Sequence, residues 1–185
     1  MRRSFVLIFT GFLLLGWLTS LPAPAQGQNP DKKGKAAKSL PVKLTHPRAL
    51  EKEVFRLTNG ARRKNHLPAL LAEGSLTAAA RGHSDDMMKR EFFDHVNPDG
   101  LTPKDRFAKH TVGEAKVGEN IFKASRLDPS DVKTMARLMV DGWMTSPGHR
   151  SNILNPDYTH LGVGVTVAGP EIRATQLFST VQGRK

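Results

Sequence analysis

The sequence predicts an α+β fold in which helices pack on a small antiparallel sheet. Two observations support this class: apolar residues recur at helical spacing between residues 50 and 143, and they alternate with glycine or threonine between residues 161 and 167. Helices that come first and a strand hairpin that comes last are the element order of an α+β domain. A length of 185 residues leaves room for one ordinary domain, and we find no internal repeat.

The first two predicted helices occupy residues 50–64 and 76–90. Apolar residues recur on one face of the first helix, at Leu50, Val54, Leu57 and Ala61. The sequence Asn-His-Leu-Pro at 65–68 then breaks it. Ser75 is a good N-cap for the second helix, because a serine oxygen accepts from the free backbone N–H groups of the first turn. The expected buried face of the second helix consists of Leu76, Ala79, Ala80, His83 and Met87.

Two more helices are predicted from their start signals. Thr102 followed by Pro103 indicates an N-cap with proline at the first helical position, which predicts a short helix to about Lys109. Ser130 similarly caps a helix that runs through Trp143. Both helices lie before the predicted strands.

The C-terminal part of the chain predicts a β-hairpin. Residues 161–167 alternate between apolar side chains and glycine or threonine, which is the period of a strand. Gly169-Pro170-Glu171 is a turn sequence, and residues 172–180 supply the second strand. We expect this hairpin to form the middle of the sheet.

The N-terminus is typical of an export signal. Arg2 and Arg3 precede an apolar run at 5–18, and Ala23-Pro24-Ala25 resembles a cleavage site. A membrane-spanning helix needs ~20 apolar residues, so we predict no transmembrane helix in the mature protein; an uncleaved anchor is the alternative. The predicted location is secreted, periplasmic or cell-envelope. The predicted organisation is a signal peptide at 1–25, a basic disordered linker at 26–47 and one folded domain at 48–182.

Charge and cysteine content narrow the classes of function. The formal net charge is +11, but residues 1–48 contribute +7 of it and the rest of the chain +4. A solvated basic tail that contacts anionic envelope polymers explains this distribution, and nucleic-acid recognition is not favoured. The absence of cysteine excludes disulfides, zinc-thiolate sites, cysteine nucleophiles and lipid attachment to a cysteine.

Three polar residues beside rigid turns are the candidates for chemistry: His95, Glu119 and His149. His95 precedes the turn sequence at 97–100, and His149 follows Ser146-Pro147-Gly148, which ends the preceding helix and leaves His149 at a helix boundary. Two imidazoles and a carboxylate are a plausible ligand set for a divalent metal, zinc foremost, with one position open for water. Alternatively they form an acid–base group in which Glu119 orients one histidine.

Simpler interpretations stand beside these. Each of the three side chains can instead satisfy backbone groups of its loop, as buried polar side chains commonly do. His83 lies on a helix face among Ala and Met, so we interpret it as a core residue and leave it out of the site. Neither a Gly-x-Ser-x-Gly elbow nor a phosphate-binding glycine loop occurs, so serine hydrolase chemistry is unsupported.

A series of segments between residues 50 and 180 occurs in an order that is specific as a whole, although each segment alone is weak. The segments are Asn59–Arg62 with Leu67–Leu70, His83–Met87, Phe92–His95 with Pro98–Gly100, Gly118–Ile121, Trp143–Leu154, Leu161–Val165 and Thr175–Phe178. Together they resemble the CAP superfamily of cysteine-rich secretory proteins, antigen 5 and pathogenesis-related proteins, in its bacterial SCP-domain branch.

The resemblance implies a three-layer α-β-α sandwich with a large open cleft. In some relatives two histidines and acidic residues converge in that cleft and hold a divalent metal, and His95, Glu119 and His149 are similar by position to three of that set. The fourth, a glutamate in eukaryotic relatives, falls at about Ser146 here. The last strand also departs from the bacterial pattern, with Arg173-Ala174 in place of Tyr-Trp.

Three hypotheses for function follow, and the fold does not decide among them. The first is an exported binding module whose cleft holds a lipid, peptide or glycan, with or without a divalent metal, and with apolar lining around Phe92-Phe93 and Trp143. The second is a metal-dependent hydrolase or peptidase in which His95 and His149 bind the cation and Glu119 is the candidate base. The third is a structural envelope protein tethered by its basic tail. Whether the protein is an enzyme stays open.

Overall fold

The computed structural model describes residues 46–110, 115–126, 128 and 130–180. These residues belong to one compact unit. The predicted signal peptide and nearly all of the predicted linker lie outside them. In chain order the elements are α1 (Pro47–Lys64), β1 (Leu71–Ala72), α2 (Gly74–Lys89), α3 (Pro103–Ala108), β2 (Val117–Ala124), α4 (Val132–Thr145), α5 (Pro147–Ile153), β3 (His160–Ala168) and β4 (Glu171–Ser179).

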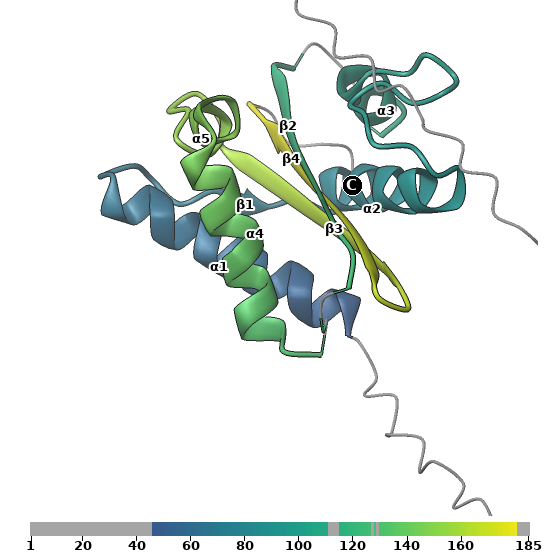
Figure 1. Ribbon diagram of the computed structural model, residues 1–185. Helices are drawn as coiled ribbons and strands as arrows, with labels where there is room; N and C mark the ends of the chain where they lie inside the picture. The colour runs from purple at the N-terminus through teal and green to yellow at the C-terminus, as the bar shows by residue number, and fades with distance from the viewer. Residues whose placement is uncertain (1–45, 111–114, 127, 129, 181–185) are drawn as a thin grey trace, which may run out of the picture. The chain divides into compact units, whose positions relative to one another are not determined.

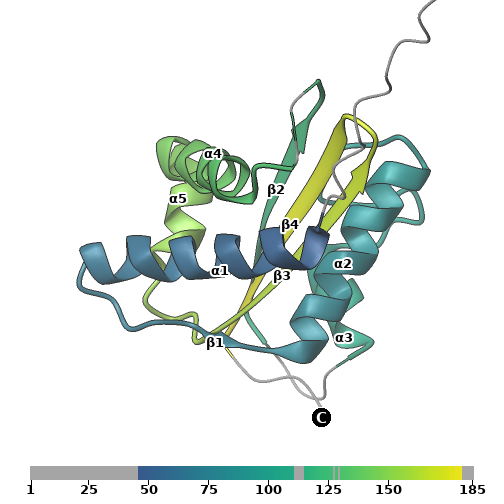
Figure 2. The same cartoon turned by 90° about the horizontal axis from the view of Figure 1, so that it is seen from below.

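The elements form three layers around a four-stranded sheet (Figures 1 and 2). The strand order is β1-β3-β4-β2, so the predicted hairpin of β3 and β4 does form the middle of the sheet. Both partners of β4 are antiparallel to it, whereas the two-residue β1 pairs with β3 in parallel. The α1 and α4 helices cover one face and α2 covers the other (Figure 2). The α+β class and the α-β-α sandwich are confirmed.

Strand β3 separates the two helical layers by the alternation of its side chains. Leu161, Val163 and Val165 are buried in the core cluster that contains residues of α1 and α4. The residues between them, Gly162 and Gly164, face α2, where a Cβ atom would meet helix backbone. The alternating glycines therefore allow α2 to lie directly on the strand.

The first helix begins at Pro47 rather than Leu50, and the N-cap residues of two other helices differ from the prediction. Glu73, not Ser75, caps α2, and Asp131, not Ser130, caps α4. The Glu73 carboxylate accepts a hydrogen bond from the backbone N–H of Leu76, and the Asp131 carboxylate accepts one from the backbone N–H of Thr134. Each carboxylate thus satisfies a first-turn donor that the expected serine would have satisfied. Thr102 caps α3 as predicted, within a reciprocal capping box.

Helix α5 was not predicted, and it changes the setting of His149. Ser146-Pro147-Gly148 ends α4 as expected, but Ser146 is at once the C-cap of α4 and the N-cap of α5. Proline at the first helical position favours this immediate restart. His149 thus lies in the first turn of a short helix.

Strand β2 was also not predicted, and it forms one edge of the sheet. Its backbone carbonyls at Glu119 and Ile121 accept hydrogen bonds from side chains of the neighbouring helices. Asn152 Nδ2 donates to the first at 3.1 Å and Trp143 Nε1 donates to the second at 3.0 Å. These two bonds attach α4 and α5 to the edge of the sheet. None of the described helices combines the length and hydropathy that a membrane crossing requires.

Candidate functional site

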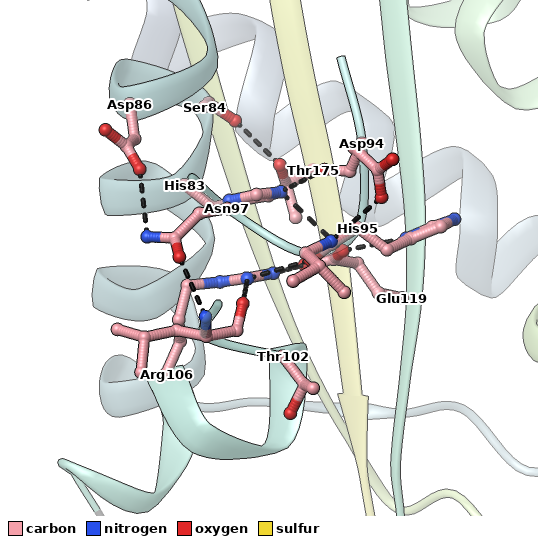
Figure 3. Close-up of polar contacts among 12 residues, drawn as sticks. His83, Ser84, Asp86, Asp94, His95, Asn97, Thr102, Arg106, Glu119 and Thr175 are labelled. Atoms are coloured by element: carbon pink, nitrogen blue, oxygen red, sulfur yellow. Dashed lines mark hydrogen bonds and ion pairs between the residues drawn. The ribbon is translucent and has the colours of Figure 1, made fainter. Parts of the chain in front are cut away.

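The Glu119 carboxylate on β2 is the centre of the polar cluster in Figure 3. The residue is only 7% exposed. His95 Nδ1 donates to Oε1 at 2.8 Å, and Arg106 Nη2 donates to Oε2 at 2.6 Å. Both carboxylate oxygens are therefore held by charged or polar donors, which a buried carboxylate requires.

Arg106 connects the carboxylate with the loop that carries His95. It lies on α3, whose start is fixed by the capping box of Thr102 and Asp105. While Nη2 contacts Glu119, Nη1 donates to the backbone carbonyl of His95 at 2.9 Å and to that of Leu101 at 2.8 Å. The planar guanidinium thus holds the loop at two points, His95 and Leu101, as well as the carboxylate.

The turn at residues 97–100 shapes this loop. Asn97 is buried, and its Oδ1 accepts from the backbone N–H of Asp99 at 3.2 Å, the hydrogen bond of an Asx turn. Gly100 closes the turn with a φ of 77°, which favours glycine. Asn97 Nδ2 donates to Asp86 on α2 at 3.1 Å, so the loop that carries His95 is attached to two helices.

His95 presents one ring nitrogen to Glu119 and the other side of its ring to solvent. Its side chain is 46% exposed, and the carboxylate accepts from Nδ1, which leaves Nε2 as the outward nitrogen. The hydrogen bond that His95 donates to Glu119 raises the pKa of His95 above its ordinary 6.5, against the lowering effect of partial burial. A carboxylate behind an imidazole fixes its tautomer and orientation.

His149 approaches the same region from α5. Asn120 Nδ2 donates to the backbone carbonyl of His149 at 3.1 Å, and Asn152 Nδ2 donates to Asn120 Oδ1 at 2.9 Å, so two asparagines hold α5 against β2. Partial burial lowers the pKa of His149, and the positive charge of His95 lowers it further. The two imidazoles are close enough to interact electrostatically, so protonation of one disfavours protonation of the other.

The side chains that flank His95 are partly apolar. Phe93 is 38% exposed and Val96 44%, and Lys123 Nζ of β2 lies 5.0 Å from the Phe93 ring centroid. Trp143, which was expected to line the cleft, is only 2% exposed and donates to the Ile121 carbonyl instead. The apolar rim is therefore formed by the loop around His95.

The arrangement of these groups limits how a metal could bind. Within the described ranges, no three His, Asp or Glu side chains are grouped so that they could hold a metal ion. Glu119 already accepts bonds with both oxygens. The two imidazoles remain as possible ligands, with Glu119 behind His95 in the position that carboxylates commonly take behind metal-binding histidines.

Comparison with known proteins establishes the family. The CAP family model, described as the cysteine-rich secretory protein family, matches residues 55–179. The chain belongs to this family. The Bacillus subtilis (strain 168) protein YkwD is 40% identical over 121 residues, which are 65% of this chain and 44% of YkwD. The CAP domain described here thus spans less than half the length of that relative.

Solved structures agree with this assignment. An extracellular protein containing an SCP domain from Bacillus anthracis str. Ames is 35% identical, with a TM-score of 0.58 over 71% of this chain and 40% of that one. The structure of NaASP2 with Zn²⁺ is 12% identical, with a TM-score of 0.52 over 74% of this chain and 84% of that one, a likeness of fold alone. The chain is a CAP/SCP-domain protein of the bacterial type.

The CAP domain contains another histidine beside Glu119 that sequence reasoning left out, and this one is fully buried. His83 on α2 is buried, as its helix face predicted, but its Nε2 lies 3.0 Å from the backbone carbonyl of Asp94 and 3.8 Å from Glu119 Oε1. A carbonyl only accepts, so Nε2 carries the proton. Burial lowers the pKa of His83, and its ring packs on Phe92.

Arg106 was missed for a different reason. The Thr102-Pro103 signal predicts its helix, but nothing local distinguishes Arg106 from the other basic residues of the chain. Its carboxylate partner comes from β2, which the sequence did not predict. At the position of the fourth acidic residue of eukaryotic relatives, Ser146 occupies the junction of α4 and α5 and offers no carboxylate.

Proposed function

We propose that this CAP domain is an exported binding module of the bacterial cell envelope, in which the imidazoles of His95 and His149 contact the bound molecule. The observation that carries the proposal is that two side chains donate hydrogen bonds to the Glu119 carboxylate. Because Arg106 and His95 occupy both of its oxygens, His95 is fixed with Nε2 outward on a half-exposed ring. A preoriented imidazole is suited to bind a polar group or a metal ion.

The rim of the site favours a ligand that is partly apolar. Phe93 and Val96 expose apolar surface next to His95, and Lys123 adds a positive charge over the Phe93 ring. The raised pKa of His95 adds a second cation at mildly acidic pH. A lipid or peptide with an anionic group fits this combination better than a neutral glycan.

A divalent metal is a proposed component of the same site. The imidazoles of His95 and His149 are the protein ligands available to it, and zinc accepts such nitrogen ligands. Catalytic zinc sites have three protein ligands, one more than this pair provides. The bound molecule or water would supply the remaining ligands of the metal. The distant relative NaASP2 was crystallised with Zn²⁺.

Hydrolysis is the second candidate function, supported by the 2.8 Å contact between His95 Nδ1 and Glu119. A histidine oriented by a carboxylate is a common general base or acid. In this arrangement Glu119 positions the base, because Arg106 already engages its other oxygen, and His95 Nε2 would exchange the proton. Turnover of a peptide or ester that is lost in His95→Gln and spared in His110→Gln would favour this alternative.

Export is proposed from two observations. The N-terminal residues have the pattern of a signal peptide, and the Bacillus anthracis relative is described as extracellular. The third hypothesis is a structural role, in which the basic tail attaches the protein to anionic envelope polymers. Deletion of residues 26–43 should release the protein from isolated envelope while the CAP domain stays folded; unchanged retention would remove that role.

Zinc binding tests the site directly. We would titrate zinc by calorimetry into the chain from Gln26 onward, into its His95→Ala/His149→Ala variant and into His66→Ala/His110→Ala as a matched control. Circular dichroism would first show that all three are folded. Saturable binding that is lost only in the first variant supports a metal at this site, and equal binding in all three would place the metal elsewhere.

Ligand retention tests the binding module itself. Organic extracts of the purified chain and of the double variant would be compared by mass spectrometry. A lipid or peptide that co-purifies with the original chain and with the control, but not with His95→Ala/His149→Ala, is the expected result. Equal retention by all three would contradict a role of these imidazoles in binding.

A further inference from the structure

A concave surface lies between α1 and α4. These are the two helices that cover one face of the sheet. It is a groove of about 660 Å³ with an apolar floor that includes Leu57 and Met144. Arg56, Arg63 and Lys64 of α1 line it. Neither His95, Glu119 nor His149 belongs to it, so it is separate from the candidate site.

Basic side chains continue beyond this groove toward the N-terminal ends of α1 and α4. A neighbouring hollow shares Arg56 and Arg63 with the groove and adds Lys52 of α1 and Lys133 of α4. We refer to the combined surface as the basic groove. Its basic residues are Lys52, Arg56, Arg63, Lys64 and Lys133, all exposed.

Acidic side chains offset only part of this charge. The acidic residues along the basic groove are Glu53 and Asp141. Glu53 is engaged by Arg56, whose Nε and Nη2 donate to it at 2.8 and 2.6 Å. Five basic and two acidic side chains give the surface a net charge of +3, which equals the net charge of the whole predicted domain at 48–182. The net charge of the folded domain is therefore concentrated here.

The cations form a row along one helix. Residues 52, 56 and 63 lie on one face of α1, and the rise of 1.5 Å per residue spreads the charges from 52 to 64 over about 18 Å. A row of cations complements a row of anions, whereas a single phosphate or lipid headgroup would engage only one or two of them. Guanidinium groups are suited to phosphate oxygens by charge and by their paired donors.

We propose that the basic groove binds a linear phosphate-bearing polymer, of the polyphosphate or poly(polyol phosphate) class. This contact is additional to any contact made by the basic tail and does not depend on the candidate site. None of the residues that line the basic groove belongs to the loop of His95 or to helix α5.

The test uses the chain from Gln26 onward and fluorescently labelled long-chain inorganic polyphosphate, followed by anisotropy at several salt concentrations. The groove variant is Arg63→Glu/Lys64→Glu. The matched control is Lys89→Glu/Lys109→Glu, which changes the charge equally at exposed residues at the C-terminal ends of α2 and α3. Circular dichroism and thermal melting verify that both variants are folded.

We expect the groove variant to bind at least about tenfold more weakly with a shallower salt dependence, and the control to stay within about twofold of the original chain. Equal weakening by both variants would mean that only bulk charge acts, and would overturn the proposal. So would undiminished binding by the groove variant, which would assign the affinity to the tail. Tighter binding to anionic phospholipid vesicles or to a single-stranded oligonucleotide than to polyphosphate would also contradict it.

Discussion

Arg106 and Glu119 form a buried ion pair, with Nη2 and Oε2 2.6 Å apart. The same guanidinium donates through Nη1 to the backbone carbonyl of His95 at 2.9 Å. Helix α3, strand β2 and the loop between α2 and α3 therefore meet at one side chain. The geometry of the His95–Glu119 contact depends on this residue, although Arg106 itself is only 8% exposed.

Replacing Arg106 should be costly to the fold. Arg106→Gln leaves the Glu119 carboxylate buried with one charged donor fewer, and breaking a buried ion pair from one side typically costs about 3–5 kcal/mol. Urea denaturation measures the loss. The control is Arg90→Gln, which removes two more exposed ion pairs, with Asp86 and Asp99, and should cost no more than about 1 kcal/mol for each. Equal losses in the two variants would contradict the special position of Arg106.

The histidines should titrate in a fixed order. The hydrogen bond that His95 donates to Glu119 raises the pKa of His95 above 6.5, while burial lowers the pKa of His83 and His149 below it. Proton and ¹⁵N NMR of the imidazoles measures all three. Glu119→Gln should lower the pKa of His95, because it removes the charged acceptor. A His95 pKa below 6.5, or one that is insensitive to this substitution, would show that the contact does not persist in solution.

The same shift gives a pH dependence of stability. Because the pKa of His95 is higher in the folded state than its ordinary 6.5, protonated His95 contributes stability that is fully present below pH 6.5 and is lost as pH rises through the raised pKa. The difference in unfolding free energy between the original chain and His95→Asn should therefore shrink above that window. Denaturation curves across the pH range measure it; a difference that grows with pH would have the wrong sign.

Arg62 should be the most important basic residue of α1 for stability. It is buried, and its guanidinium donates to the backbone carbonyls of Pro68, Ile153 and Asn155, each at 2.8 Å. Arg62→Met leaves these acceptors without that donor, and an unsatisfied buried polar group costs about 1–3 kcal/mol. We expect a total of about 3 kcal/mol or more in urea denaturation. The exposed neighbour offers the control, since Arg63→Met should change stability by no more than about 0.5 kcal/mol.

Two glycines should respond in opposite directions to alanine. A Cβ on Gly164 would meet the backbone of Ala80 and Arg81, so Gly164→Ala must push α2 away from β3. We expect a loss of about 1–3 kcal/mol or more. Gly142 lies inside α4 with nothing within 4 Å of an added Cβ, so Gly142→Ala should stabilise by up to about 1 kcal/mol. Thermal melting measures both changes, and a Gly164→Ala variant as stable as the original chain would contradict the prediction.

Elements with strong local signals were predictable from the sequence. The apolar face of α1, the Thr102-Pro103 start of α3, the alternation of β3 and the turn that leads into β4 each depend on neighbours within a few residues. The cap positions were less predictable, because Glu73 and Asp131 form the same bonds as the serines that were expected. The hairpin also forms although Arg173-Ala174 replaces the usual aromatic pair, since Ala174 stays buried in the core cluster.

Strand β2 and the full polar cluster were not predictable by local pattern. Three consecutive residues of β2, Glu119, Asn120 and Ile121, are buried, so the alternation that marks a half-exposed strand is absent. Their partners come from α3, α5 and β4, far away in sequence. His95 and His149 could be selected because rigid turns flank them, whereas Arg106 and His83 become part of the cluster only through tertiary contacts.

The bonds from Trp143 and Asn152 to the carbonyls of β2 also bear on self-association. An edge strand normally offers free carbonyls on which a strand of another molecule can extend the sheet. Here the indole and the amide already occupy two of them, so the middle of this edge is protected by side chains rather than by charge or proline. Both protecting groups belong to α4 and α5, so a local opening that lifts these helices would uncover the strand before the core unfolds. Aggregation of this protein should therefore follow the opening of that helical pair more closely than it follows global unfolding.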